Sequence, residues 1–357
     1  MDFNTSDVAL KQNIRIVNFL KENGKDDLIN EIVRGLISER PRISSKFFYD
    51  DRGSALFERI TALKEYYPTR TEKSIIREFA VDILKGNTVE DIIELGSGDC
   101  SKISLLLEGI QTKDLSKYRY VPVDVSKAAI LQSANELALK FQELRIDGYV
   151  LDFTTHIDQL EKRNPALFCF FGGTIGNFDR ADGLNLLSEI RSIMSEDDIL
   201  LLGFDMIKDP ALLNAAYNDS LGITAEFNVN ILNVVNSIIG SDFDTADFEH
   251  FAFFNSHESR IEMHLIAKRD LTLNSPYLSD NLLIKQGSRI HTENSYKFSP
   301  EMIEQLAYGA GLVISNNYSD NNNSFSLVEM RRARARSQEP GVVLKLSSRE
   351  LAKDLSA

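Results

Sequence analysis

A short apolar run that ends in two closely spaced glycines is the first feature of this sequence that could do chemistry. Residues 92–95 are Ile-Ile-Glu-Leu, and Gly96 and Gly98 follow with one serine between them. Glycines at such a point let the backbone turn sharply and approach a ligand where a Cβ atom would clash. The spacing lacks the third glycine of the dinucleotide fingerprint, so it does not indicate pyrophosphate binding. A plain structural turn is the alternative interpretation.

Two further apolar runs end in residues that suit a nucleoside. The first ends in Asp124, whose carboxylate oxygens could accept both hydroxyls of a ribose, although a helix cap beside Ser126 is the alternative. The second leads into Asp152 and Phe153, which suit the edge and the face of an adenine or a structural strand end. The carboxyl ends of neighbouring strands in an open α/β sheet face one crevice. Together the three strand ends favour S-adenosylmethionine (SAM) over a dinucleotide.

The elements that must position these residues alternate between short apolar runs and helical patterns from about residue 90. Such alternation is typical of a parallel sheet covered by helices, which places the chain in the α/β class. A helix capped by Ser126 is predicted between the second and third runs. Its apolar face carries Ile130, Ala134, Leu137, Phe141 and Leu144. The predicted strands are Asp91–Leu95, Tyr118–Asp124, Gly148–Leu151, Leu167–Phe171 and Ile199–Phe204.

The regular alternation lapses after Asp205 and resumes with a helix that begins near Ser299 and Pro300. Two last strands, Leu312–Ser315 and Ser324–Met330, are joined by a short Asn-rich turn and must pair antiparallel. A mostly parallel, Rossmann-like sheet with a C-terminal antiparallel hairpin resembles the class I SAM-dependent methyltransferase fold. We expect an N-terminal helical extension (1–45), a SAM-binding methyltransferase domain (46–205 and 297–330), an inserted substrate-binding domain (206–296) and a basic, then polar, solvated tail (331–357).

Composition narrows the class of partner. The chain has 40 Lys and Arg against 53 Asp and Glu, and this net charge of -13 would repel a phosphate backbone, so nucleic acid is not expected as a partner. The N-terminus lacks the pattern of a signal peptide, and no apolar stretch reaches membrane-spanning length, which favours a cytoplasmic protein. Cys100 and Cys169 form no CxxC pair, the histidines have no ligand spacing, and no metal is expected.

Three longer motifs carry a resemblance to a known family. The runs Lys46–Glu58 (KFFYDDRGSALFE) and Glu65–Glu72 (EYYPTRTE) resemble the N-terminal signature of the histidine N-alpha-methyltransferases, and so does Phe171–Phe178 (FGGTIGNF). The resemblance extends from about Lys46 to about Met330. Departures are small: Gly173 stands where a serine is expected, the loop after Gly98 reads Asp-Cys, and the first 45 and last 27 or so residues have no counterpart.

The resemblance implies both a cofactor site and an amino-acid site. The implied SAM contacts are Gly96, Lys102, Asp124, Asp152 and Phe153, to which the glycine turn adds Gly98. The implied amino-acid contacts are Tyr66, Asn177, Tyr217, Glu293, Asn294 and Ser295, with Tyr49 and Met263 close by. His291 lies near this set, and an incidental or structural role is expected for it.

Methyl transfer from a sulfonium is an in-line displacement, so catalysis consists mainly of positioning. Asn177 offers a carbonyl acceptor to the amine and an amide donor to the carboxylate of the amino acid, and the aromatic face of Tyr49 could stabilise the growing cation. These two residues are the expected catalytic ones. Glu293, paired with the Ser295 hydroxyl, is expected to read the side chain by accepting an imidazole N–H.

The function that the resemblance implies is SAM-dependent N-methylation of the alpha-amino group of L-histidine, up to the trimethylated betaine hercynine, as in ergothioneine biosynthesis. An enzyme for another aromatic amino acid, such as tryptophan or a derivative, is one alternative. A non-catalytic protein that binds SAM or an amino acid is the other. The expected partners are small molecules only, with no membrane and no second copy of the chain.

Overall fold

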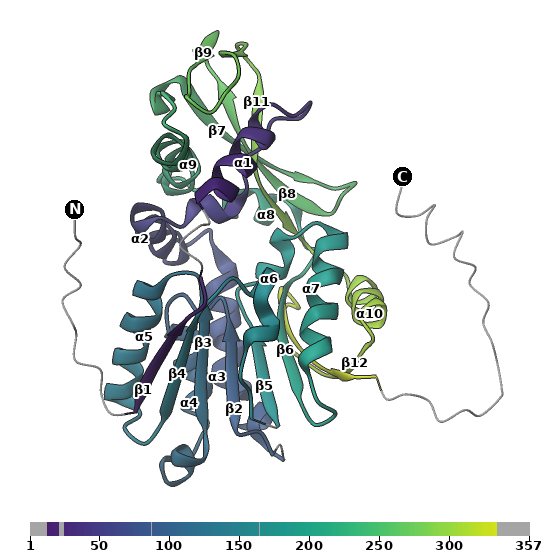
Figure 1. Cartoon of the computed structure of the whole chain (residues 1–357). Coiled ribbons are helices and arrows are strands. Elements are labelled where there is room, and N and C mark those ends of the chain that lie inside the picture. The colour runs from purple at the N-terminus through teal and green to yellow at the C-terminus, as the bar shows by residue number, and fades with distance from the viewer. Residues whose placement is uncertain (1–12, 21–24, 87, 164, 334–357) are drawn as a thin grey trace, which may run out of the picture.

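The computed structural model describes residues 13–20, 25–86, 88–163 and 165–333. Its centre is an eight-stranded sheet with the strand order β1-β4-β3-β2-β5-β6-β13-β12 (Figure 1). Neighbouring strands from β1 to β6 pair parallel, whereas β13 pairs antiparallel with both β6 and β12. The strands are β1 (Ile14–Asn18), β2 (Asp91–Leu95), β3 (Arg119–Asp124), β4 (Arg145–Val150), β5 (Ala166–Phe170), β6 (Ile199–Asp205), β12 (Leu312–Ser319) and β13 (Phe325–Arg332). The expected α/β class with a C-terminal antiparallel hairpin is confirmed.

Helices cover both faces of this sheet, which explains why its central strands are continuously apolar. On one face α3, α4 and α5 bury an apolar core against the strands, and on the other face α7 and α10 do the same. These helices are α3 (Tyr67–Leu84), α4 (Ser101–Leu107), α5 (Lys127–Lys140), α7 (Arg180–Ile193) and α10 (Pro300–Gly309). Short helices fill the connections: η3 (Thr112–Lys117), α6 (Phe153–His156), η4 (Ile157–Gln159) and η5 (Thr174–Asn177).

A second unit lies beyond the carboxyl ends of the parallel strands (Figure 1). Its three-stranded antiparallel sheet has the order β11-β8-β7, and helices pack against it around one apolar core. Its elements are α1 (Lys25–Leu36), η2 (Ser45–Phe48), α2 (Asp51–Thr61), α8 (Pro210–Tyr217), α9 (Ile223–Ile239), η6 (Thr245–Asp247), β7 (Phe248–Asn255), β8 (Arg260–Ala267) and β11 (Arg289–Tyr296), with the pair β9 (Leu271–Leu273) and β10 (Leu282–Ile284). We refer to it as the upper unit.

The N-terminal part of the chain differs from the expectation in two ways. The expected helical extension contains a strand, because Ile14–Asn18 pairs with β4 at the edge of the central sheet. Residues that follow Lys46, such as Phe48 and Leu56, were expected in the methyltransferase domain but lie in the core of the upper unit beside Phe227 and Val235. The upper unit is therefore built from two separate stretches of sequence. The tail was expected from residue 331, but Arg331 and Arg332 are the last residues of β13; from residue 334 onward it lies outside the described residues.

The predicted strands agree with the structure to within a few residues, because each is an apolar run bounded by polar or turn residues. Ser126 caps α5 as expected, accepting a hydrogen bond from the Ala129 N–H at 3.2 Å. The predicted helix was too long: α5 ends at Lys140, so Phe141 and Leu144 are buried in the loop that follows. Both side chains still contribute to the core, which is why their spacing resembled a helix face.

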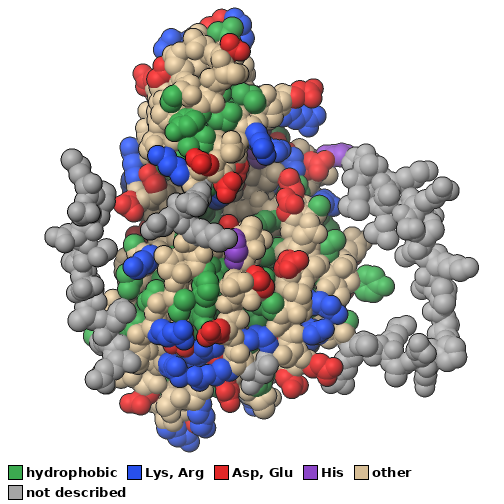
Figure 2. Space-filling view, viewed as in Figure 1, with side chains coloured by type: hydrophobic (Ala, Val, Ile, Leu, Met, Phe, Trp, Pro, Cys, Tyr) green, Lys and Arg blue, Asp and Glu red, His purple; other side chains and the backbone are tan. Residues whose placement is uncertain are grey.

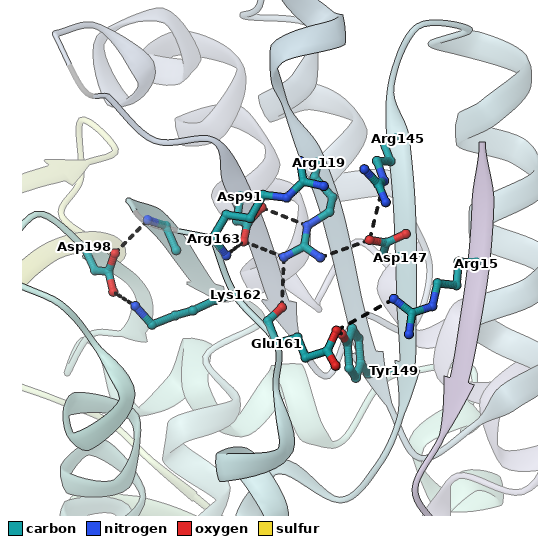
Figure 3. A network of polar contacts seen from close by, with 11 residues as sticks. Arg15, Asp91, Arg119, Arg145, Asp147, Tyr149, Glu161, Lys162, Arg163 and Asp198 are labelled. Carbon is teal, nitrogen blue, oxygen red and sulfur yellow. Dashed lines mark hydrogen bonds and ion pairs between the residues drawn. The ribbon is translucent and has the colours of Figure 1, made fainter.

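An ion-pair network holds the amino-terminal edge of the sheet together (Figure 3). Arg119 starts β3 and is 4% exposed; its guanidinium contacts Asp91 at 2.6 Å and Asp147 at 3.0 Å. Burial of charge is tolerated here because both carboxylates are paired and hydrogen-bonded. Asp124 ends the same strand at the opposite edge. The network is therefore structural, and the carboxyl edge is left for ligands.

Candidate active site

The glycine turn after β2 is held in place by its neighbours. Gly96 and Gly98 adopt φ values of +67° and +44°, which side chains other than glycine rarely adopt. The Gly98 N–H donates to Asp124 Oδ2 at 3.0 Å, and the Gly98 carbonyl accepts from the Ser133 hydroxyl at 2.9 Å. The turn and the end of β3 thus form one rigid edge.

Asp124 accepts hydrogen bonds from the backbone on both of its oxygens. Oδ1 takes the Ser126 N–H at 2.9 Å, and Oδ2 takes that of Gly98. Burial raises the pKa of Asp124, although these two bonds oppose the rise. The side chain of Ser126 caps α5, so Asp124 is not needed as the cap of that helix. A carboxylate oxygen has two lone pairs, so each oxygen can still accept from a ligand.

The end of β4 comes close to the glycine turn. Asp152 caps α6, since its Oδ1 accepts the Thr154 N–H at 2.9 Å. The Phe153 ring packs edge-on against Phe170 at 5.6 Å between centroids. A Cβ atom built on Gly96 would lie 3.7 Å from that Phe153 ring, which shows how near the two segments are. The structure thus brings the ends of β2, β3 and β4 together.

Lys102 is anchored by a residue that the sequence did not single out. Its ammonium lies 2.8 Å from Glu72, a fully buried carboxylate on α3. Glu72 also accepts the Gly172 N–H on both oxygens at 2.9 Å. A Cβ atom on Gly203 of β6 would lie only 2.5 Å from Glu72, so glycine at that position makes room for the carboxylate. One acid on α3 therefore positions Lys102 and the loop after β5.

An irregularity in β11 decides which way Glu293 points. His291 pairs with His264 and Glu293 pairs with Met263, so Thr292 is an extra residue in β11 at this point. Paired residues of an antiparallel sheet share a face, and successive residues alternate. The bulge therefore puts Glu293 on the face of Met263 and leaves His291 with His264 on the other face. The expected incidental position of His291 agrees with this geometry.

Glu293 is buried without a protein partner. It is 8% exposed, and its carboxylate makes no hydrogen bond or ion pair with any described residue. Burial raises its pKa to about 7, with the charge of Lys297 opposing that rise. Met263 beside it is 1% exposed and supplies an apolar wall. No hydrogen bond joins Glu293 to Ser295, whose hydroxyl oxygen contacts Tyr217 and Lys297, so the expected joint reading of the side chain by Glu293 and Ser295 stays a prediction.

Those groups form a buried network beneath Glu293 that the sequence did not predict. The Ser295 hydroxyl accepts from Tyr217 at 2.7 Å and from Lys297 at 2.9 Å. Lys297 is 1% exposed and forms an ion pair with Asp205 at 2.7 Å. Asp205 in turn accepts the Tyr67 hydroxyl at 2.7 Å. The network joins the end of β6 to β11 and α8, that is, the central sheet to the upper unit.

Aromatic side chains border the same region. Tyr66 is 9% exposed and stacks edge-on against Tyr217, with 6.3 Å between ring centroids. Tyr49 stacks edge-on against Phe57 and Phe227. Tyr49 as a whole is 46% exposed, and desolvation of its hydroxyl, followed by repulsion from Glu293, Tyr217 and Asp124, raises its pKa.

Both tyrosines lie on the upper unit. Tyr49 follows η2, and Tyr66 directly precedes α3. The space-filling view shows the surface hollowed at this level, where the upper unit meets the sheet (Figure 2).

Asn177 ends η5, which packs against β11. The backbones of η5 and β11 lie close together, since a Cβ atom on Gly176 would lie 2.7 Å from the Tyr296 carbonyl oxygen. The Asn177 side chain is partly buried and makes no hydrogen bond with a described residue. Gly173, where the family resemblance led us to expect serine, directly precedes η5 and has φ +64°, so glycine suits the backbone there.

Two further observations concern ligands and membranes. Among the described residues, no group of three or more His, Cys, Asp and Glu side chains could hold a metal ion. No helix within the same residues is long and apolar enough to cross a membrane.

Comparison with known proteins gives the family. Residues 28–332 match the family described as histidine-specific methyltransferase, SAM-dependent. The histidine N-alpha-methyltransferases of Mycolicibacterium smegmatis and Mycobacterium tuberculosis are each 34% identical over 315 residues, covering 88% of this chain and 98% of the relative. A 4-dimethylallyltryptophan N-methyltransferase of Aspergillus fumigatus is 24% identical, covering 83% of this chain and 91% of the relative.

A solved SAM-dependent methyltransferase from Clostridium acetobutylicum aligns with a TM-score of 0.41 and 9% identity over 73% of this chain and 92% of that one. The family match begins at residue 28, so it includes α1, upstream of the motif at Lys46 where the resemblance was expected to begin. It ends at Arg332, the last residue of β13. The chain therefore belongs to the family of histidine-specific, SAM-dependent methyltransferases and is a SAM-dependent methyltransferase enzyme.

Proposed function

We propose that this enzyme methylates the alpha-amino nitrogen of L-histidine and repeats the transfer until the trimethylated betaine, hercynine, is formed. The observation that carries the proposal is Glu293, a buried carboxylate with no hydrogen-bond partner among the described residues. An ionised carboxylate left unpaired in a protein interior is costly, so a ligand N–H would complete the site. The imidazole of histidine supplies such an N–H beside an apolar wall, here Met263. The names of the 34% identical relatives agree with this substrate.

The residues at the carboxyl edge of the sheet fit SAM, which supplies the methyl group as a sulfonium. Asp124 would accept the ribose hydroxyls, and the side-chain-free backbone at Gly96 leaves room beside Phe153, which would face the adenine. Lys102, held by Glu72, would bind the carboxylate of the cofactor. These roles are proposals supported by the meeting of the three strand ends.

On the amino-acid side the protein mainly holds and orients the substrate. Asn177 has a free amide that can accept from the amine and donate to the carboxylate. An alpha-amino group titrates at roughly pH 8, so part of it is a free base at neutral pH and no strong catalytic base is required. A tyrosine phenol, whose pKa is ordinarily about 10, is protonated at neutral pH, so Tyr49 would offer a hydrogen-bond donor and an aromatic face for the growing cation.

Turnover with purified protein tests the proposal. Incubation with SAM and each amino acid in turn, followed by mass spectrometry, should give the mono-, di- and trimethylated forms of histidine. Product from tryptophan and none from histidine would identify the alternative enzyme for another aromatic amino acid. Binding of SAM and histidine without any product would identify a non-catalytic binding protein. Either result would contradict the proposal.

A further inference from the structure

The buried ammonium of Lys297 contacts three oxygen atoms. They are Asp205 Oδ2 at 2.7 Å, Ser295 Oγ at 2.9 Å and the Tyr217 hydroxyl at 3.3 Å. An ammonium has three N–H donors and no lone pair, so each of these oxygens accepts a hydrogen bond from Lys297 and none donates to it. The direction of every hydrogen bond around Lys297 is therefore fixed as long as this lysine is charged.

Lys297 remains charged despite its burial. Burial by itself lowers the pKa of a lysine, but attraction to Asp205 and the hydrogen bonds to Asp205 and Tyr217 outweigh that effect and raise the pKa. Asp205 is kept ionised in the same way, since Lys297 and Lys208 lower its pKa against the effect of burial. The other titratable group close to Lys297 on the ligand side is Glu293.

The directions of the hydrogen bonds that Lys297 donates also determine whether Ser295 donates or accepts. The Tyr217 oxygen accepts from Lys297, and its own proton is donated to Ser295 Oγ at 2.7 Å. Ser295 Oγ thus accepts from both Tyr217 and Lys297, which uses the two lone pairs of a hydroxyl oxygen. The Ser295 proton must point away from both of these donors. Ser295 is therefore a hydrogen-bond donor toward any ligand that reaches it.

Glu293 and Ser295 lie two residues apart on the same strand and face the same side. An ionised Glu293 can only accept, and Ser295 can only donate. A neutral imidazole matches this pair, because one ring nitrogen carries a proton and the other carries a lone pair. An imidazolium ring has two N–H groups and would present one of them to the Ser295 donor.

We propose that Lys297 is a positioning residue that, through Tyr217 and Ser295, makes the pocket bind histidine with a neutral imidazole ring. This inference rests on the proposed function. Ser295 donates to the ring nitrogen with the lone pair, and Glu293 accepts from the ring N–H. The arrangement also keeps a second positive charge away from the alpha nitrogen, which becomes permanently cationic in the product.

Nitrogen NMR of bound histidine tests the inference directly. Histidine with both ring nitrogens labelled with 15N is bound to the full-length enzyme with S-adenosylhomocysteine at pH 7.5. A carboxylate beside an ionisable group ordinarily shifts its pKa by about 1–3 units, so Glu293 alone would protonate the ring at this pH. We expect instead one N–H nitrogen and one nitrogen with a lone pair. Two protonated ring nitrogens in the wild type would overturn the inference.

Variants separate Lys297 from Glu293. Ser295→Ala removes the donor and should give a doubly protonated ring, with histidine binding weakened about tenfold, the loss of one hydrogen bond of about 1.4 kcal/mol. The double variant Lys297→Met with Asp205→Asn removes this ion pair and leaves Lys208 bonded to Tyr67 and to the Met206 carbonyl. It should also give a protonated ring, because Ser295 is then free to rotate. His291→Gln, on the opposite face of the same strand, is the control and should keep the ring neutral.

The outcomes distinguish the inference from the proposed function. A neutral ring in the Ser295→Ala protein and in the double variant would overturn the role of Lys297 while leaving histidine as the substrate. Failure of the folded wild type to bind histidine, measured by calorimetry, would overturn the proposed function and this inference with it.

Discussion

A buried carboxylate without a protein partner, such as that of Glu293, gives the enzyme a means of rejecting the wrong amino acid. We expect Glu293→Ala to lower kcat/KM for histidine by roughly ten- to hundredfold, the loss of a charge-assisted hydrogen bond of about 1.5–3 kcal/mol. Activity on tryptophan should rise relative to histidine, because the penalty for leaving the carboxylate unpaired is gone. Steady-state kinetics with both amino acids measure this ratio.

Asn177→Ala is the comparison variant for this experiment. Its amide is expected to hold the amine and carboxylate that all amino acids share, so it should slow both substrates by a similar factor. If Glu293→Ala also slows histidine and tryptophan equally, Glu293 does not read the side chain, and the assignment of histidine loses its physical support.

The raised pKa of Glu293 also makes stability depend on pH. Its pKa is raised from 4.5 to about 7 in the folded protein, so the stability it contributes is present at low pH and lost as pH rises through 7. Glu293→Gln removes this loss. The free energy of unfolding of the variant, relative to that of the wild type, should therefore be higher at pH 8 than at pH 5 by on the order of 3 kcal/mol. Denaturant titrations at the two pH values measure the difference.

Glu249→Gln, an exposed acid on β7, is the matched control and should give nearly the same stability change at both pH values. A Glu293→Gln protein that gains nothing between pH 5 and pH 8 would show that the carboxylate already has a partner in the folded protein.

The sequence singled out residues that end apolar runs or to which the family resemblance assigns a role, and it did not single out the buried polar residues that hold them. Gly96 and Asp124 follow apolar runs, so their position at the carboxyl edge could be derived before the structure was known. Lys208 and Lys297 lie outside the three motifs and have the polarity of ordinary surface residues, whereas Tyr67 lies in the motif Glu65–Glu72 with no role assigned to it. Only Asp205 carried a signal, because it ends a fully apolar strand just as Asp124 does.

At the scale of elements, the packing of α3 on β6 controls the cofactor side of the site. Gly203→Ala would place a Cβ atom 2.5 Å from Glu72 Oε1, and Glu72 is fully buried and holds Lys102. We expect a loss of about 1–3 kcal/mol in stability from overpacking and weaker SAM binding, with the KM for histidine little changed. Calorimetry with SAM and thermal unfolding test both effects.

Gly183→Ala in α7 is the control because it makes the same substitution where there is room. Its Cβ atom would meet Ile175 at an ordinary contact distance of 3.5 Å. Alanine is favoured over glycine in a helix interior by roughly 0.5–1 kcal/mol, so this variant should be as stable as the wild type or more so. Equal SAM affinity in the Gly203→Ala and wild-type proteins would contradict the positioning role of Glu72.

Strands were easier to predict than the bulge that orients the site. A buried strand is recognised by its apolar run, but the extra residue Thr292 in β11 has no local signature. Regular alternation would have put His291, Glu293 and Ser295 on one face. The pairing partners in β8 reveal the bulge, and these are known only once the strands are aligned in space. The family motif singled out Glu293 and Ser295 without showing why His291 lies on the other face of the strand.

At the scale of the whole molecule, the division of the chain into two units does not follow the order of the sequence. Helices α1 and α2 precede the central sheet in the chain, yet their apolar faces pack with α9 and β8. Both stretches carry the amphipathic pattern of any surface helix, which does not reveal the partner. As a result, Tyr49 and Tyr66 belong to the upper unit, whereas Asp124 lies on the central sheet and Lys102 on helix α4, which covers that sheet.

The edge strand β1 gives a prediction that separates stability from catalysis. It lies outside the family match, pairs with β4 along Ile14–Asn18 and buries Ile14, while Phe19 stacks on Tyr149 at 5.9 Å. Deleting residues 1–20 removes these contacts and exposes the edge of β4. Since burial of one large apolar side chain contributes roughly 1.5–3 kcal/mol, we expect a loss of several kcal/mol and a tendency to aggregate. The KM values for SAM and histidine should stay close to those of the wild type, because Asp152 and Phe153 remain held by α6 and Phe170.

Deletion of residues 334–357, which follow the last strand, is the control and should change neither stability nor turnover of histidine. Denaturant titration and steady-state kinetics of both truncated proteins decide the matter. An N-terminal deletion that unfolds at the same denaturant concentration as the wild type would contradict the stabilising role of β1, and one that stays as stable but loses SAM affinity would show that β1 serves the site and not the sheet.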